Sequence, residues 1–139
     1  MIKRIISRAC ALLAAAFTSG VNFAHAQACV CPDQTFEFAL AEADFAFLGK
    51  ARGSGDVCDG TIHRPGDAPF ATMFDVIEVL GGEVDERFLA RHEKAAAYCG
   101  KVFEPGTEYL VFGTVNEKGA AFTNACSARS VTSKLVKGK

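Results

Sequence analysis

The chain has 139 residues, of which 15 are basic and 16 acidic, and half of its residues are hydrophobic. This balance offers no basic stripe to neutralise phosphates, which argues against a nucleic-acid-binding protein. The length suits one domain with a modest core and leaves no room for a second domain of ordinary size.

The first 28 residues are predicted to be a secretory signal peptide. They begin with three basic residues, continue through the mostly apolar run 9–21 and end with alternating alanines at Ala24, Ala26 and Ala28. The apolar run is too short to cross roughly 30 Å of hydrocarbon, so we expect no membrane span. Removing the segment takes away three of the 15 basic residues and none of the 16 acidic ones, which leaves a net charge of −4. We expect the product to be a secreted or periplasmic monomer.

Two cleavage frames satisfy the small-x-small rule, and the choice decides which residue starts the mature chain. Cleavage after Ala26 leaves Gln27 first, whereas cleavage after Ala28 leaves Cys29 first. We take the second frame, so that the predicted domain spans residues 29–139. Lipidation of Cys29 stays open as well, since residues 26–29 faintly resemble a lipobox, although they include no large apolar residue.

The remaining sequence predicts a β-rich domain with one short helix. Asp33 or Thr35 is the expected cap of a helix that follows at once, and the aromatic-rich run 43–51 is typical of a buried strand. Residues 52–69 are rich in glycine and proline and predict a long exposed loop. Alternating apolar residues predict further strands over 70–80, 84–92, 107–115 and 120–126, before a polar tail over 127–139 that forms a weak helix or frays. We therefore expect an all-β fold with one or two short helices, arranged as a small barrel or sandwich.

We find no catalytic motif in the sequence, and we expect the protein to be neither an enzyme nor dependent on a cofactor. His63 lies alone in the predicted loop, and His92 lacks the second histidine one helical turn later that a zinc-protease helix requires. We interpret both histidines as ordinary surface residues. No serine occupies a Gly-x-Ser-x-Gly elbow of the kind that hydrolases use.

The cysteines form the most specific pattern in the chain. Cys10 leaves with the signal peptide, and the mature chain keeps Cys29, Cys31, Cys58, Cys99 and Cys126. Two cysteines separated by a single residue cannot easily bridge each other, so Cys29 and Cys31 each need a distant partner. Two bridges and one odd thiol are the natural count for an exported protein. A redox role for the Cys-x-Cys pair is a further alternative, which requires the pair to stay reactive.

Short motifs follow the Cys-x-Cys pair in a fixed order along the predicted domain. They are ADFAFLGK at 43–50, VLGG at 79–82, YCG at 98–100, GTEYLVF at 106–112 and NACS at 124–127. This order and spacing resembles the netrin-like module, specifically the N-terminal domain of the tissue inhibitors of metalloproteinases. The resemblance implies a five-stranded OB-fold barrel with the bridges Cys29–Cys99 and Cys31–Cys126.

In that family the free α-amine and the carbonyl oxygen of the first cysteine chelate the catalytic zinc of the protease. The resemblance therefore implies an exported inhibitor whose partner is a zinc metalloprotease and whose zinc-binding residue is Cys29, through backbone atoms. An α-amine has a pKa of about 7.7 to 8.0, low enough to lose its proton and donate to a zinc ion with an open position. The implied protease-binding residues are Cys29, Val30, Cys31, Pro32, Ala97 and Tyr98.

The chain also departs from that family. Cleavage before Gln27 would turn the amine of Cys29 into an amide and remove the chelating group. The third bridge and the second domain of the animal inhibitors are missing from the sequence, and Cys58 has no counterpart. The alternative function is a non-inhibitory netrin-like binding or structural module of the cell envelope, which needs no free amine.

Overall fold

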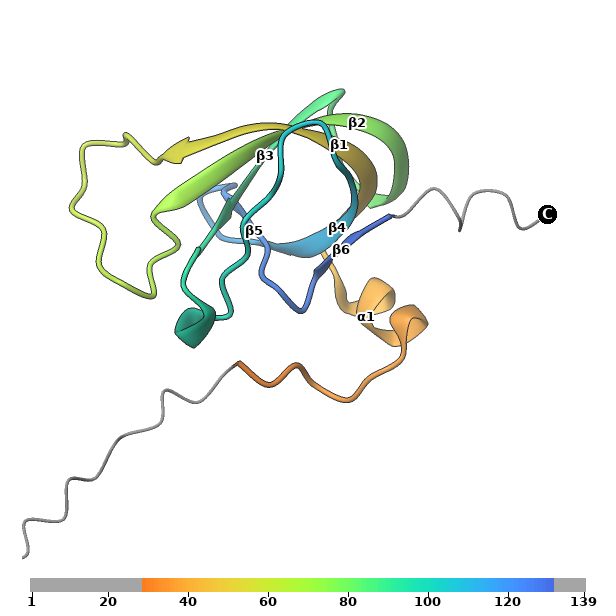
Figure 1. Ribbon diagram of the computed structural model, residues 1–139. Helices are drawn as coiled ribbons and strands as arrows, with labels where there is room; N and C mark the ends of the chain where they lie inside the picture. Colours follow the sequence, from red (N-terminus) through yellow and green to blue (C-terminus); the bar gives the residue numbers. More distant parts are fainter. Residues whose placement is uncertain (1–28, 132–139) are drawn as a thin grey trace, which may run out of the picture.

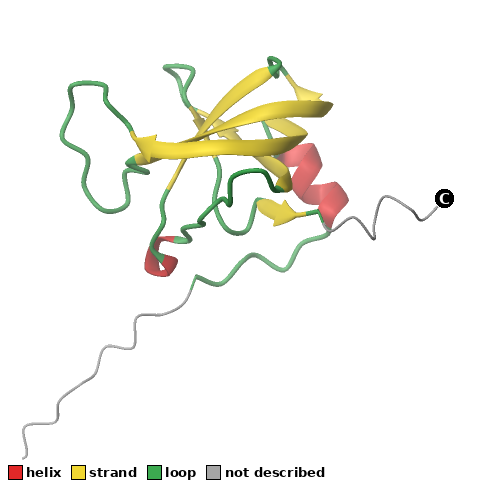
Figure 2. Cartoon of the chain, turned by 45° about the horizontal axis from the view of Figure 1, so that its top comes forward, coloured by secondary structure: helices red, strands yellow, loops and turns green. Residues whose placement is uncertain are grey.

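A computed structural model describes residues 29–131. The predicted signal peptide, residues 1–28, lies outside the described residues, as does the end of the tail, residues 132–139. The described residues form a curved sheet with one α-helix packed against it (Figure 1, Figure 2). The elements are α1 Phe36–Glu42, β1 Phe45–Asp56, β2 Phe70–Gly82, β3 Arg87–His92, the 3-10 helix η1 Ala96–Tyr98, β4 Glu108–Val115, β5 Ala121–Phe122 and β6 Ala128–Ser130. No helix in this range is long and apolar enough to cross a membrane.

Five of these strands close into a barrel in the order β1-β2-β3-β5-β4. Closure occurs because β4 pairs with β5 near its end and also pairs with β1 along its first part. Neighbouring strands are antiparallel except β3 and β5, which are parallel over Ala90–Arg91 and Ala121–Phe122. The last strand, β6, pairs with the first part of β4, whereas β5 pairs with the end of β4. The fold is therefore the all-β, OB-type barrel that the sequence analysis predicts, and closure removes the exposed edges of its strands.

Phenylalanine side chains fill the barrel. Because side chains alternate across a strand, Phe45 and Phe47 of β1 both point inward and are at most 1% exposed. Phe47 packs against Phe74 of β2 and Phe88 of β3, with ring centroids 5.5 and 5.0 Å away. The inner face of the first strand is thus the centre of the core.

Helix α1 attaches the N-terminal end of the described chain to the outside of the barrel. Thr35, rather than Asp33, is its cap, since the Thr35 hydroxyl accepts a hydrogen bond from the Phe38 N–H at 3.3 Å. On its buried side, Phe36 meets Phe112 of β4 edge-on, with ring centroids 6.2 Å apart. These contacts fix where the residues before the helix lie.

The structure corrects three predicted boundaries. Strand β1 continues to Asp56, so the loop occupies 57–69 instead of 52–69, because the polar residues 53–56 still pair with β2. The predicted strand 120–126 is only two residues long, since the chain turns at Asn124–Ser127, where the Ser127 N–H donates to the Asn124 carbonyl. The tail predicted to be helical or frayed includes β6, which pairing with β4 stabilises. In the first and third cases a partner strand overrides local composition, and in the second a local turn ends the strand.

Gly113 lies where β1, β4 and β5 meet. It pairs with Phe45, and a Cβ atom at this position would collide with the carbonyl oxygen of Phe122. We expect Gly113→Ala to lower the free energy of unfolding by about 1–3 kcal/mol, because the backbone of β5 must move. Urea denaturation measures the change, and Gly53→Ala is the matched control, since a Cβ atom there meets nothing within 4 Å. Equal stability of the two variants would contradict the close approach.

Candidate functional site

Two disulfides attach the segment before α1 to the far end of the chain. Cys29 is bonded to Cys99 and Cys31 to Cys126, with Cα atoms 5.0 and 5.3 Å apart. These are the bridges that the family resemblance implies. Within residues 29–131 they leave Cys58 as the free cysteine, and its side chain is exposed. Disulfides persist in oxidising compartments, as expected of an exported protein.

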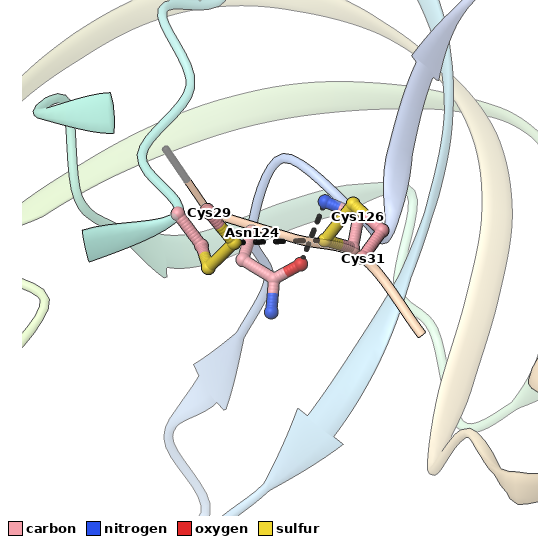
Figure 3. The surroundings of a disulfide bond; sticks show 5 residues. Cys29, Cys31, Asn124 and Cys126 are labelled. Carbon is pink, nitrogen blue, oxygen red and sulfur yellow. Dashed lines mark hydrogen bonds between the residues drawn. A yellow bond between two sulfur atoms is a disulfide. The ribbon is translucent and has the colours of Figure 1, made fainter. Parts of the chain in front are cut away.

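We call residues 29–32 the N-terminal ridge. These residues form neither helix nor strand, and the side chain of Val30 is 88% exposed between the two bridged cysteines. Cys31 and Pro32 are exposed as well, while Cys29 is partly buried. Figure 3 shows the disulfides of Cys29 and Cys31, the two cysteines that flank Val30 in the sequence. The ridge is therefore accessible along its length and fixed at two points.

The Cys29–Cys99 bridge brings the η1 turn beside the ridge. Ala97 and Tyr98 are both exposed, Tyr98 by 48%. The turn ends at Cys99, whose φ of 55° is left-handed and whose N–H donates to the Ala96 carbonyl at 3.1 Å. The η1 turn, which includes Ala97 and Tyr98, and the start of the described chain, residues 29–32, lie at the same end of the molecule (Figure 1) and are joined by the Cys29–Cys99 bridge.

The sequence analysis did not identify the residues that support Cys99 and Cys126, the partners of the two ridge cysteines. The Asn124 side-chain oxygen accepts from the Cys126 N–H at 2.8 Å, and the Ala125 N–H donates to the Cys99 carbonyl at 2.8 Å. The first contact could have been predicted from the sequence, because an asparagine side chain commonly accepts a hydrogen bond from the backbone N–H two residues further on. The second joins segments far apart in the sequence and follows only from the fold.

A cavity of about 290 Å³ lies under the ridge, between α1 and the Asn124–Ser127 turn. The two bridges line it together with Phe36, Phe112 and Arg129. Inside it, the Sγ atoms of Cys29 and Cys126 are in contact at 3.9 Å although they belong to different bridges (Figure 3). With the Sγ atom of Cys99 they form a cluster of potential metal ligands within 4.8 Å of one another. In the oxidised chain these sulfurs are occupied by their bridges.

The interpretation of His92 as a surface residue is wrong. Its side chain is completely buried beside the core, with its ring centroid 5.0 Å from that of Phe103. Nδ1 donates to the Glu93 carbonyl at 3.0 Å, and Nε2 accepts from the Thr72 hydroxyl at 2.7 Å. Burial lowers the pKa of His92 from its ordinary value of 6.5 because the charged ring loses its water. The imidazole is thus a neutral, structural group.

The interpretation of His63 needs correction too, because its side chain is only 13% exposed. Nε2 lies 3.0 Å from an Asp59 carboxylate oxygen, and Nδ1 accepts from the Arg91 guanidinium at 3.3 Å. Hydrogen bonds from the side chain and backbone of Thr61, with a smaller contribution from His63, lower the pKa of Asp59 to about 2. The Glu93 carboxylate accepts from the N–H groups of residues 66 and 68 at 2.7 and 3.0 Å. These residues anchor the loop 57–69 to β3.

The buried histidine makes stability depend on pH. Since the pKa of His92 is lowered in the folded state, the unfolded chain binds the proton more readily. We expect the free energy of unfolding contributed by this group to be constant above pH 6.5 and to fall as the pH drops below it, by at most about 1.4 kcal/mol per pH unit. Urea denaturation from pH 7.5 to 5 measures the slope. His92→Gln should flatten this part of the curve and His63→Gln should not; identical slopes in the two variants would refute the assignment.

No protein-family model matches the chain, and no curated protein sequence matches it. The ridge presents the apolar side chain of Val30 to solvent between two cysteines that are both cross-linked to distant parts of the chain.

Proposed function

We propose that the processed chain is an exported inhibitor of zinc metalloproteases, related to the netrin-like inhibitors that its motifs resemble. The observation that carries the proposal is the N-terminal ridge, in which Val30 is 88% exposed between two cysteines that are both cross-linked to the barrel. A segment fixed in this way loses little conformational entropy when a protease binds it. The barrel and the bridging pattern agree with the resemblance.

The inhibitory chemistry belongs to the backbone of Cys29. When this residue comes first, its α-amine and its carbonyl oxygen are two donors that reach one metal ion together. A catalytic zinc ion has three protein ligands and a bound water, and the water is the nucleophile of hydrolysis. Replacing that water with the amine blocks the reaction without any covalent step.

The side chains of the site select the protease. Val30 enters the pocket that normally receives a substrate side chain, and its branched apolar shape favours a pocket of moderate size. Cys31 and Pro32 continue along the cleft. Ala97 and Tyr98 form the second edge, where an exposed tyrosine offers a large contact area at a small cost in side-chain entropy.

N-terminal sequencing and intact mass measurement of the exported protein test the premise. A first residue Cys29 with an unmodified amine, and four cysteines in two bridges, is the result we expect. A start at Gln27, or an acyl chain on Cys29, would refute inhibition by chelation. The chain would then be the netrin-like binding or structural module of the cell envelope that needs no free amine.

Acetylation of the α-amine tests the mechanism directly. We expect acetylation to abolish inhibition, because the lone pair of an amide nitrogen is delocalised into its carbonyl group and is not available to zinc. At neutral pH the acetylating reagent modifies the α-amine in preference to lysine side chains, because lysine, with a pKa of about 10.4, is almost fully protonated. Inhibition constants against a panel of zinc metalloproteases, before and after acetylation, supply the measurement. Unchanged constants would show that the amine takes no part.

The free amine also predicts a dependence of inhibition on pH. Only the deprotonated amine coordinates zinc, so inhibition should strengthen as the pH rises through about 8, the ordinary pKa of an α-amine. The acetylated protein is the control for the protease's own pH dependence. A flat profile for the unmodified inhibitor would contradict the proposal.

A further inference from the structure

The two disulfides beneath the ridge lie side by side, and the sulfurs that meet between them are separated like neighbouring ligands of a metal ion. The Sγ atoms of Cys29, Cys99 and Cys126 lie within 4.8 Å of one another, and those of Cys29 and Cys126 are 3.9 Å apart without being bonded. A tetrahedral zinc site has Zn–S distances of about 2.3 Å, which places neighbouring sulfurs about 3.8 Å apart. Cys31 does not belong to this group of three, but its sulfur is bonded to that of Cys126 and is the fourth sulfur of the two bridges.

Two of these cysteines are held in place without their bridges. The Ala125 N–H donates to the Cys99 carbonyl at 2.8 Å, and the Asn124 side chain accepts from the Cys126 N–H at 2.8 Å. The Cys99 N–H is bonded in turn to the Ala96 carbonyl at 3.1 Å. None of these three hydrogen bonds involves a sulfur atom, so none of them depends directly on a bridge.

The other two cysteines are tethered close to this pair. Only residues 32–35 separate Cys31 from α1, and α1 is fixed to the barrel by the packing of Phe36 on Phe112. A short tether of this kind keeps the effective concentration of the Cys-x-Cys pair high after its bridges are opened. All four thiols therefore remain at one end of the barrel.

The cluster is accessible from solvent. Both bridges line the 290 Å³ cavity under the ridge, and Cys31 is exposed. A small reductant and a metal ion reach the sulfurs without unfolding the barrel.

We propose that the two bridges conceal a metal site: after reduction, Cys29, Cys31, Cys99 and Cys126 bind one Zn²⁺ ion as thiolates. Each disulfide takes two electrons and two protons from one molecule of an external dithiol, which is oxidised to its own disulfide. Binding then releases the four thiol protons as four metal–sulfur bonds form. Bridges and metal are mutually exclusive states of the same residues. The site does not depend on protease inhibition.

A titration with Co²⁺, a coloured substitute for Zn²⁺, tests the site. The purified protein is reduced with a phosphine under anaerobic conditions, freed of reductant and titrated while its visible spectrum is recorded. We expect one Co²⁺ per chain with the strong bands of tetrahedral cobalt thiolate, displaced by one equivalent of Zn²⁺, and no bands from the oxidised protein. Absence of the bands after reduction would overturn the proposal.

Variants separate the cluster from the free thiol. Cys58→Ser should bind the ion as the unchanged protein does, while Cys99→Ser and Cys126→Ser should each weaken binding by more than about tenfold, since even indirect neighbours of a metal are worth that much. Metal binding that requires Cys58, or that Cys99→Ser leaves unchanged, would refute the site.

Circular dichroism of the reduced protein distinguishes a site built by the fold from capture by a disordered chain. The far-ultraviolet spectrum of the Co²⁺-loaded protein should match that of the oxidised protein. A loaded chain that keeps the spectrum of an unfolded one would overturn the proposal even if the ion binds.

Discussion

On the proposed function, we expect a protein that keeps Gln27 and Ala28 ahead of Cys29 to inhibit a zinc metalloprotease at least about 100-fold more weakly than one that begins at Cys29. The reason is that the extra residues convert the amine into an amide and occupy the approach to the zinc ion. Ligation of a catalytic metal is worth several kcal/mol, and a loss of about 2.7 kcal/mol already corresponds to a factor of 100. The ridge and its bridges are unchanged, so the loss is chemical and not structural.

The two proteins should be prepared with defined first residues and compared in the same inhibition assay. Their thermal unfolding midpoints serve as the control and should agree, because the two proteins share residues 29–139 and both disulfides. Val30→Gly in the shorter protein is a second comparison, which weakens inhibition by removing the pocket side chain while leaving chelation possible. Similar inhibition constants for the protein that begins at Gln27 and the protein that begins at Cys29 would contradict chelation.

Removal of either disulfide will lower the free energy of unfolding by about 2–5 kcal/mol. The pair variants are Cys29→Ser with Cys99→Ser, and Cys31→Ser with Cys126→Ser. The bridges span 70 and 95 residues, and because the entropy of a closed loop grows only with the logarithm of its length, the two losses should differ by less than about 0.5 kcal/mol. Urea denaturation of the oxidised proteins gives both values.

Cys58→Ser is the matched control for these variants, since its thiol takes part in neither bridge. It should unfold at the same urea concentration as the unchanged protein. A bridge variant as stable as this control would show that the unfolded chain is not measurably restricted by that link.

The barrel was predictable from the sequence because its core strands carry their own signal. The aromatic-rich run around Phe45 and Phe47 is typical of a buried strand, and alternating apolar residues along β2 and β4 indicate a buried inner face. β5 is a small part of the strand predicted over 120–126, and β6 lies in the tail predicted to be helical or frayed. Their two or three residues are strands only because β3 and β4 supply hydrogen bonds to them.

The candidate site was predictable where it is continuous in sequence. The ridge is a run of four residues, whereas the pairing of its cysteines came from a family resemblance and not from their spacing, which allows several pairings. The burial of His92 had no local signal either, because its partner Thr72 is twenty residues away and its burial arises from the closed barrel. Contacts between distant segments, such as Ala125 with Cys99, are visible only after folding.

The position of the bridges also sets the order in which the molecule matures. The two cysteines at the start of the described chain wait for partners 70 and 95 residues downstream, so newly made protein cannot complete both links until Cys126 has emerged. Contacts of such long range form late in folding. The N-terminal ridge is consequently fixed at both points only at the end of maturation, and a translation product that stops between Cys99 and Cys126 can close only one of the two links.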